Sequence, residues 1–498
     1  MAAVADVAAV TMDRPPPLTD TALMGHPRGL GLLFMVEMWE RFSYYGMRAL
    51  LVLYLVNFLK WSDGDASRLY GTYTSLVYLT PLIGGYLADR FIGTRRSLVI
   101  GSIVIASGHF CLAFQSMTTF YIGLGLIIIG TGFFKPNVST MVGQMYREGD
   151  TRRDAGFTIF YMGVNLGGFL APLVCGYLGQ RVGWHFGFAA AGVGMLLGLG
   201  IYLWGRDKYL PGIGLTREQT SANAAALGAQ GVIEMEKVNY VPGLIGAAAG
   251  LLLALVLRGG WLGYAFGAII GAAVGTTVFG SKGEERNRVV AIFTVAFFVV
   301  FFWMAFEQAG SSMNLFADRH TNLSIGGFAF PSSWFQSMNP LFIMIFAPVF
   351  ASIWTTLGAR GKEPSTALKM VLGLALVGCG FLFMAGAGRI ADSGFKASAI
   401  WLTLTYAFNT WGELCLSPVG LSYVTKIAPV RFASLLMGVW YLANAAANKL
   451  GGFLASQTEN IPKLGTFYLI PVATSFGAAL LLLLLVPWLK RLTRGVKA

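Results

Sequence analysis

The chain contains fourteen segments that are apolar over about 18 to 29 residues, and no other feature constrains its fold as strongly. An α-helix rises about 1.5 Å per residue, so about 20 apolar residues span the hydrocarbon core of a bilayer. The segments are 31–59, 69–88, 97–115, 118–143, 155–180, 184–204, 240–257, 261–280, 288–313, 334–358, 366–388, 397–425, 432–456 and 465–489. We therefore predict an all-α polytopic membrane protein with fourteen transmembrane helices, embedded in a lipid bilayer.

The composition agrees with a membrane protein and argues against several other classes. Of the 498 residues, 55% are hydrophobic and only 12% are charged, and the mean hydropathy is +0.64. The net charge of +13 is spread along the chain, so we expect no nucleic-acid partner. The four cysteines all lie within apolar segments, so we expect neither a disulfide framework nor a metal site.

Lysine and arginine are distributed unequally between the two sides of the predicted membrane. With both termini on one side, the loops and tails of that side hold 24 of the 36 basic residues, and the opposite loops hold 8. Loops rich in these residues stay in the cytoplasm. We therefore predict that both termini are cytoplasmic. The remaining bases lie within apolar segments, and they are Arg41, Arg48, Lys135 and Lys449. Lys449 is near the outer end of its segment, so we expect its ammonium group to reach the membrane surface.

The first apolar segment contains two carboxylates and two guanidinium groups. Residues 37–48 read EMWERFSYYGMR, which places five functional side chains on one face of a helix: Glu37, Arg41, Tyr44, Tyr45 and Arg48. A charge at the centre of a membrane helix costs about 2.5–3.5 kcal/mol. These side chains therefore face a protein interior or a water-filled cavity, because Arg41 lies too deep for its guanidinium to reach the membrane surface.

The segments divide along the chain as six, two and six. Residues 85–96 read GYLADRFIGTRR, which resembles the loop signature of the major facilitator superfamily. That resemblance implies two six-helix bundles around a central cavity. The predicted regions are a cytoplasmic tail 1–28, an N-terminal bundle 29–205, a linker 206–287 with an inserted helical hairpin at about 240–280, a C-terminal bundle 288–491 and a tail 492–498.

The inserted pair has no charged side chain at membrane depth, so we interpret it as structural. Its second segment places Gly263, Gly267, Gly271 and Gly275 four residues apart, which favours close packing against a neighbouring helix. We expect the pair to contribute no group to a substrate site.

Three motifs narrow the family. Residues 37–46 read EMWERFSYYG, residues 130–137 read GTGFFKPN and residues 160–167 read FYMGVNLG. In these stretches the chain resembles the proton-coupled oligopeptide transporter family, and FWMAFEQ at 302–308 and WGE at 411–413 are similar to it too. The resemblance implies a symporter that imports di- and tripeptides with protons by alternating access. The inserted pair is typical of bacterial members, which implies a multi-pass protein of the bacterial inner membrane.

A zwitterionic peptide needs fixed charges of both signs at opposite ends of a cavity. The intramembrane bases concentrate in the predicted N-terminal bundle, and Glu307 and Glu413 lie in the C-terminal one. We expect the peptide carboxylate to face Arg41, Arg48 and Lys135 and the ammonium to face Glu413. Aromatic side chains are predicted to form the amphipathic walls of the cavity: Tyr44, Tyr45, Tyr78, Trp303 and Trp440. Asn165 and Asn339 are predicted to form hydrogen bonds with the peptide bond.

Proton coupling requires a carboxylate whose charge depends on conformation. Glu307 facing Arg48 would join the two bundles when it is ionised and release them when it is protonated. Glu37 and Glu40 could form a second switch with Arg41 and Lys135. The proton is then the coupling ion, and no other cofactor is expected.

Other classes fit the sequence less well. No GxxxxGK[ST] motif occurs, so nucleotide-driven transport is not expected. Ser107 and His109 lie two residues apart on different helix faces, and neither HExxH nor GxSxG accompanies them, so we predict that the chain is not an enzyme. A channel would need a symmetric ring of groups as its selectivity filter, and the sequence of this single chain shows no such symmetry. The alternative that remains is a symporter of the same family for an amino acid, nitrate or a peptide-like compound.

Overall fold

The computed structural model describes residues 21–22, 24–146, 150–215, 239–256 and 260–493. Most of the predicted tail 1–28, residues 216–238 of the predicted linker and most of the tail 492–498 lie outside the described residues. Each of the fourteen predicted apolar segments contains a helix. Eight of the described helices are long and apolar enough to cross a membrane by length and composition. Helix α2 (Arg28–Leu53) is not among them because of the charges that it carries.

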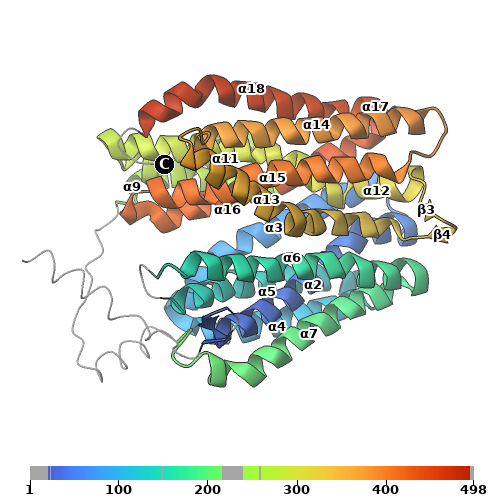
Figure 1. Ribbon diagram of the computed structural model, residues 1–498, viewed down its shortest axis with the longest axis horizontal. Helices are drawn as coiled ribbons and strands as arrows, with labels where there is room; N and C mark the ends of the chain where they lie inside the picture. The colour runs from blue at the N-terminus through green and yellow to red at the C-terminus, as the bar shows by residue number, and fades with distance from the viewer. Residues whose placement is uncertain (1–20, 23, 147–149, 216–238, 257–259, 494–498) are drawn as a thin grey trace, which may run out of the picture.

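The first bundle is built from six long helices, which form the lower half of Figure 1. They are α2, α3 (Asp63–Leu87), α4 (Thr94–Leu112), α5 (Met117–Gln144), α6 (Arg153–Tyr177) and α7 (Trp184–Tyr209). Helix α2 packs between α6 and α7, and α4 packs on α5. The start of α3 follows from its sequence: the Ser62 hydroxyl accepts a hydrogen bond from the Asp65 amide at 3.1 Å, and Asp63 and Asp65 complement the helix dipole.

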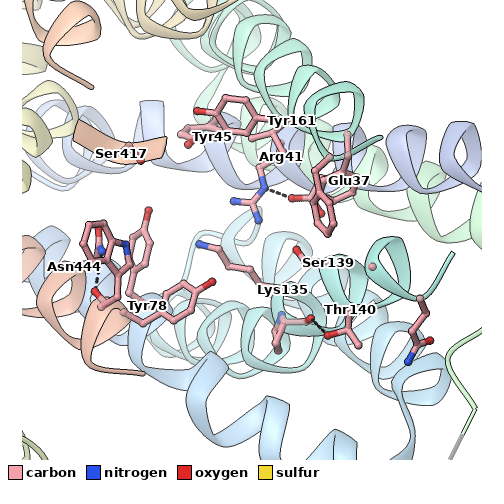
Figure 2. Close-up of a pocket in the computed structure, with 18 of the residues that line it drawn as sticks. Glu37, Arg41, Tyr45, Tyr78, Lys135, Ser139, Thr140, Tyr161, Ser417 and Asn444 are labelled. Carbon is pink, nitrogen blue, oxygen red and sulfur yellow. Dashed lines mark hydrogen bonds and ion pairs between the residues drawn. The ribbon is translucent and has the colours of Figure 1, made fainter. Parts of the chain in front are cut away.

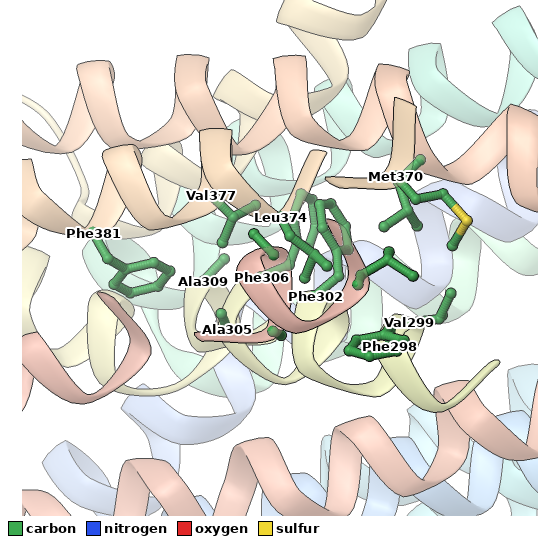
Figure 3. Close-up of a cluster of buried hydrophobic side chains, with 14 of the residues drawn as sticks. Phe298, Val299, Phe302, Ala305, Phe306, Ala309, Met370, Leu374, Val377 and Phe381 are labelled. Carbon is green, nitrogen blue, oxygen red and sulfur yellow. The ribbon is translucent and has the colours of Figure 1, made fainter. Parts of the chain in front are cut away.

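The second bundle forms the upper half of Figure 1. Its helices are α11 (Gly283–Phe306), α12 (Ser312–His320), α13 (Met338–Ala359), α14 (Thr366–Asp392), α15 (Ala399–Ile427), α16 (Ala433–Ser456), α17 (Leu464–Phe467) and α18 (Leu469–Leu492). Between α12 and α13 lies a short hairpin of β3 (Ser324–Ile325) and β4 (Phe328–Ala329), turned by Gly326 and Gly327 with positive φ. Figure 3 shows the core of the bundle, where Phe298, Phe302 and Phe306 of α11 meet Leu374, Val377 and Phe381 of α14.

The predicted helix 288–313 is not continuous. Helix α11 ends at Phe306, a tight turn of 3₁₀ helix covers Glu307–Gly310, and α12 then continues to His320. At the break, Gly310 lies directly against the Tyr70 hydroxyl of α3 and leaves no room for a side chain. The break places Glu307 at the end of α11, where the two bundles meet.

The inserted hairpin consists of α9 (Val241–Val256) and α10 (Gly260–Val274), and α10 continues as a π-helical turn, Gly275–Phe279. Gly267 and Gly271 of α10 lie against the backbone of Gly250 and Gly246 of α9. A side chain at these positions would meet backbone atoms, so the glycines permit the close contact of the two helices. The predicted stripe therefore packs inside the hairpin, except for Gly263, whose Cβ position faces open space.

The two bundles meet along α3 and α16 on one side and along α6 and α13 on the other. At the first seam Gly71 of α3 faces Gly452 of α16, and a Cβ atom at Gly71 would come within 2.7 Å of the Gly452 Cα atom. Beside them Lys449, which we expected to reach the membrane surface, bonds instead to the Thr72 hydroxyl across the seam at 2.6 Å.

Candidate functional site

A cavity of about 730 Å³ lies between the bundles. It reaches Gly143 and Gln144 at the end of α5 and Arg153 at the start of α6, so it extends to that end of the molecule. Its lining comes from α2, α3, α5 and α6 on one side and from α11, α15 and α16 on the other. Seven of the predicted site residues line it, namely Glu37, Arg41, Tyr45, Tyr78, Lys135, Trp303 and Trp440.

Two cationic side chains point into this cavity from different helices. Figure 2 shows the Arg41 guanidinium of α2 and the Lys135 ammonium of α5 directed toward the same space. The Nε atom of Arg41 is 2.7 Å from Glu37 Oε1 and 2.8 Å from Glu40 Oε2, so both carboxylates of α2 form ion pairs with it. The Nζ atom of Lys135 lies 4.1 Å from the centroid of the Tyr78 ring, a cation–π contact.

The predicted pair between Arg48 and Glu307 is present. The Nη2 atom of Arg48 donates to Glu307 Oε2 at 2.5 Å, and Arg48 Nε donates to the Tyr70 hydroxyl at 2.6 Å. Both charged side chains are buried. Because Arg48 and Tyr70 belong to the first bundle and Glu307 to the second, the three groups join the bundles at membrane depth.

Glu413 lies beside a second, much smaller cavity of about 20 Å³, which Tyr45, Arg48 and Asn339 help to line. The Asn339 side-chain amide donates to Glu413 Oε2 at 2.8 Å and to the Thr410 hydroxyl at 3.1 Å. An amide compensates a buried carboxylate less well than a cation does. Among the described residues, no base lies within ion-pair distance of Glu413, so the arrangement suits a cationic ligand group.

Five of the predicted site residues line neither cavity in this conformation: Glu40, Tyr44, Asn165, Glu307 and Glu413. Glu40 and Glu307 are held in the ion pairs described above. Asn165 of α6 donates its amide to the Tyr161 carbonyl at 2.9 Å, and Tyr44 packs in the core of the first bundle. The roles of all these residues in substrate binding and proton coupling stay predictions.

The cavity also has lining residues that the sequence analysis did not select. Among them are Ser139, Thr140, Phe157, Tyr161, Tyr441 and Asn444. Tyr161 stands within the FYMGVNLG motif, and Asn444 lies one helical turn after Trp440, so both carried a sequence signal. Arg153, the first residue of α6, lines the cavity as well. The neighbouring Arg152 hydrogen-bonds to Asp150 and lowers the pKa of that carboxyl to about 2, which keeps it ionised.

At the opposite end of the molecule, polar bonds fasten the bundles together. Arg319 of α12 holds both carboxylate oxygens of Asp63 of α3, at 2.6 and 2.9 Å. The Asn57 amide donates to Asp318 at 2.9 Å, and Gln180 and Ser332 are hydrogen-bonded at 2.8 Å. Near these bonds the Asn314 amide of α12 reaches the Ala49 carbonyl of α2. The structure is therefore closed at this end and open at the end that Arg153 marks.

Comparison with known proteins agrees with this architecture. Residues 95–470 match the PTR2 model, which describes the POT family. The chain belongs to the POT family. It is 43% identical to "Uncharacterized transporter YclF" of Bacillus subtilis, and the match covers 95% of this chain and 96% of that protein. It is 38% identical to "Peptide transporter YePEPT" of Yersinia enterocolitica, covering 93% and 94%, and 36% identical to a "Di-/tripeptide transporter" of Lactococcus lactis, covering 95% and 98%.

Solved structures of the same family show a similar fold. A crystal structure of a peptide transporter POT in complex with sulfate is 36% identical, and the match covers 98% of this chain and 99% of that one with a TM-score of 0.80. A POT family transporter in complex with 5-aminolevulinic acid is 32% identical, with coverage of 96% and 99% and a TM-score of 0.79. The chain is therefore a polytopic membrane transporter of the major facilitator type and not an enzyme.

Proposed function

We propose that the chain imports di- and tripeptides together with protons, without a bound cofactor or nucleotide. The observation that carries the proposal is the division of charge around the space between the bundles. Arg41 and Lys135 point into the cavity from the first bundle, and Glu413 stands in the second with only a neutral amide as its described partner. A free peptide has one charge of each sign at its ends, and this division matches it. The names of the Yersinia and Lactococcus relatives support the same substrate class.

In the proposed orientation the peptide carboxylate binds near Arg41 and Lys135, and the ammonium approaches Glu413. Tyr45, Tyr78 and Trp440 present flat amphipathic surfaces between the charged ends. Such surfaces accept many side chains because their contacts are mainly dispersive and non-directional. A cavity of about 730 Å³ is also in the range that holds small organic ligands.

In alternating access, the two bundles would be bonded to each other at one end of the molecule while the cavity is open at the other end. The excess of basic residues in the loops of the open end supports a cytoplasmic location for that end and for both termini. The structure would therefore be the inward-facing state of a transporter in the bacterial inner membrane. In that state the bonds of Arg319 and Gln180 close the outer side.

One alternative has a specific observation in its favour. The relative in complex with 5-aminolevulinic acid binds a compound that has an amine and a carboxylate but no peptide bond. The charges around the cavity of this chain would suit such an amino acid too. Nitrate fits less well, because Glu413 would repel an anion.

Uptake into proteoliposomes tests the proposal. The purified protein should accumulate a labelled dipeptide when the outside is acidic, and a protonophore should abolish the accumulation. Unlabelled di- and tripeptides should compete, whereas nitrate should not. Equal uptake with and without the gradient would refute proton coupling, and competition by 5-aminolevulinic acid but not by dipeptides would favour the alternative.

A further inference from the structure

Helix α10 of the inserted hairpin contacts the two bundles through one row of buried side chains. Among the described residues of α10, three are buried, namely Leu262, Phe266 and Ala273. Helix α9 packs on α10 and its π-helical extension, and most of its other side chains are exposed. These three buried side chains of α10 are therefore the apolar contact between the hairpin and the two bundles.

Two of these side chains, Leu262 and Phe266, lie where the two bundles meet. Leu262 and Phe266 form an apolar cluster with Leu442 and Ala445 of α16, which belongs to the second bundle. Three side chains of α3, in the first bundle, pack against the same cluster: Leu76, Tyr78 and Leu79. The hairpin therefore braces both helices of the α3–α16 seam at once.

The other side of this seam is the wall of the substrate cavity. Tyr78 of α3 lines the cavity together with Trp440 and Asn444 of α16. The Tyr78 ring also carries the cation–π contact with Lys135. Tyr78 thus has one side against the cluster that contains Phe266 and another against the ammonium group that faces the cavity.

The opposite end of the hairpin is fixed to the second bundle. Arg431, which precedes α16, donates through Nε to Glu285 at the start of α11 at 2.7 Å and also reaches the Gly280 carbonyl at the end of the hairpin. Ala273 packs with Ala296 of α11 and with Val439 of α16. The end of the hairpin is therefore bonded to the second bundle, while Leu262 and Phe266 belong to the cluster against which Tyr78 of the first bundle packs.

We infer that Leu262 and Phe266 are positioning residues for substrate binding, because they hold Tyr78 against Lys135 from behind the cavity wall. Tightly packed interiors leave few alternative rotamers, so removing the brace would free the Tyr78 ring and loosen the end of the cavity that receives the carboxylate. This inference deepens the proposed function and depends on it for its peptide readout. The hairpin would then set affinity without placing any atom in the cavity.

The test compares Phe266→Ala with Phe279→Ala, a matched change at an exposed phenylalanine of the same insertion. Dipeptide binding to purified protein is measured by calorimetry. We expect Phe266→Ala to weaken binding about fivefold, which corresponds to roughly 1 kcal/mol, and Phe279→Ala to stay within about twofold. Phe266→Leu retains much of the apolar volume and should restore most of the affinity, which also covers the case in which the alanine variant folds poorly.

A double-mutant cycle shows whether the effect passes through Tyr78. In a Tyr78→Leu background, Phe266→Ala should change affinity by less than about twofold, because the positioned ring is absent. An equal loss in both backgrounds, or native affinity in both Phe266 variants, would overturn the inference.

A measurement without substrate separates this inference from the proposed function. A thiol introduced by Asn444→Cys, in a protein that keeps Tyr78, should react at least about threefold faster with a water-soluble maleimide when Phe266 is alanine, because a looser cavity wall exposes it more often. The parent protein reports the background from its own four cysteines. Unchanged thiol reactivity overturns the positioning role whatever the substrate is, whereas failure of the unmodified protein to bind a dipeptide would overturn only the proposed function.

Discussion

Replacing Glu307 with glutamine tests the proposed coupling between the proton and the two bundles. In the structure Glu307 Oε2 accepts a hydrogen bond from Arg48 at 2.5 Å, and Arg48 is also bonded to Tyr70. A glutamine oxygen can accept the same bond, but the side chain stays neutral and cannot take up or release a proton. The substitution therefore removes the charge and keeps the shape.

The expected size of the transport effect follows from the proton gradient. A difference of one pH unit supplies about 1.4 kcal/mol per proton, which sustains roughly tenfold accumulation of a substrate that is coupled to one proton. If Glu307 carries the coupled proton, the Glu307→Gln variant should lose this accumulation and reach an inside-to-outside ratio of about one. Exchange of peptide across the membrane needs no net proton movement, so it should survive.

The effect on stability separates coupling from misfolding. Removing one partner of a buried ion pair costs about 3–5 kcal/mol, because the other charge is left uncompensated. Glu307→Ala should fall in this range, since Arg48 would keep only Tyr70. Glu307→Gln retains an acceptor for Arg48 and should be clearly more stable. Thermal unfolding of both variants with the native protein provides this control.

The assay measures driven uptake and counterflow on the same proteoliposomes. Loss of driven uptake with counterflow retained supports the reasoning. If Glu307→Gln accumulates a dipeptide as the native protein does, the coupled proton is bound elsewhere, and the Glu37, Glu40 and Lys135 group of α2 and α5 becomes the next candidate. If counterflow also disappears in a well-folded variant, Glu307 is needed for the conformational change itself.

Two further changes address the ends of the substrate and of the molecule. Glu413→Gln should weaken the binding of dipeptides with a free amino terminus about tenfold, on the scale of a charge-assisted hydrogen bond, and should hardly affect the binding of N-acetylated analogues. Calorimetry with both ligands checks this, and equal losses of affinity would contradict the assigned orientation. Asp63→Asn weakens the bidentate contact with Arg319, which is partly exposed and so worth no more than about 1 kcal/mol, and should shift the balance toward the outward-open state about three- to fivefold. Distance measurements between spin labels on α3 and α12 check the shift. Asp65→Asn is the control, because the partners of Asp65 among the described residues, Ser62 and Arg68, belong to the same bundle and not to α12.

The helical pattern and much of the site could be predicted from the sequence for a simple physical reason. A membrane leaves the backbone few options, so long apolar runs indicate helices, and a charge within such a run must face the protein interior. That argument selects Arg41, Arg48, Lys135 and Glu307. The FYMGVNLG motif adds Asn165, and the structure places Lys135 in the cavity but turns the Asn165 amide toward Tyr161.

The rest depends on contacts between segments far apart in the chain, which a single sequence does not contain. At the helix break after Phe306, Gly310 lies against Tyr70, a residue more than 200 positions earlier in the chain. The same holds for Lys449, which lies near the end of an apolar run but finds Thr72 across the seam. The hairpin was expected to be structural because it has no charged group at membrane depth, and only its packing shows that Phe266 belongs to the cluster against which the cavity residue Tyr78 packs.

The helix break also gives Glu307 an electrostatic setting that a continuous helix would lack. Glu307 is the residue at which α11 ends, and the negative end of a helix dipole disfavours a carboxylate there. The ionised form therefore depends on Arg48 of the other bundle for its stability. When a proton neutralises the carboxylate, the attraction to Arg48 falls from that of an ion pair to that of a hydrogen bond between a cation and a neutral acceptor, while the helix end no longer repels the group. Protonation at this position is consequently expected to loosen the contact between the bundles without destabilising α11, which is the property that a proton-driven change between two packed states requires.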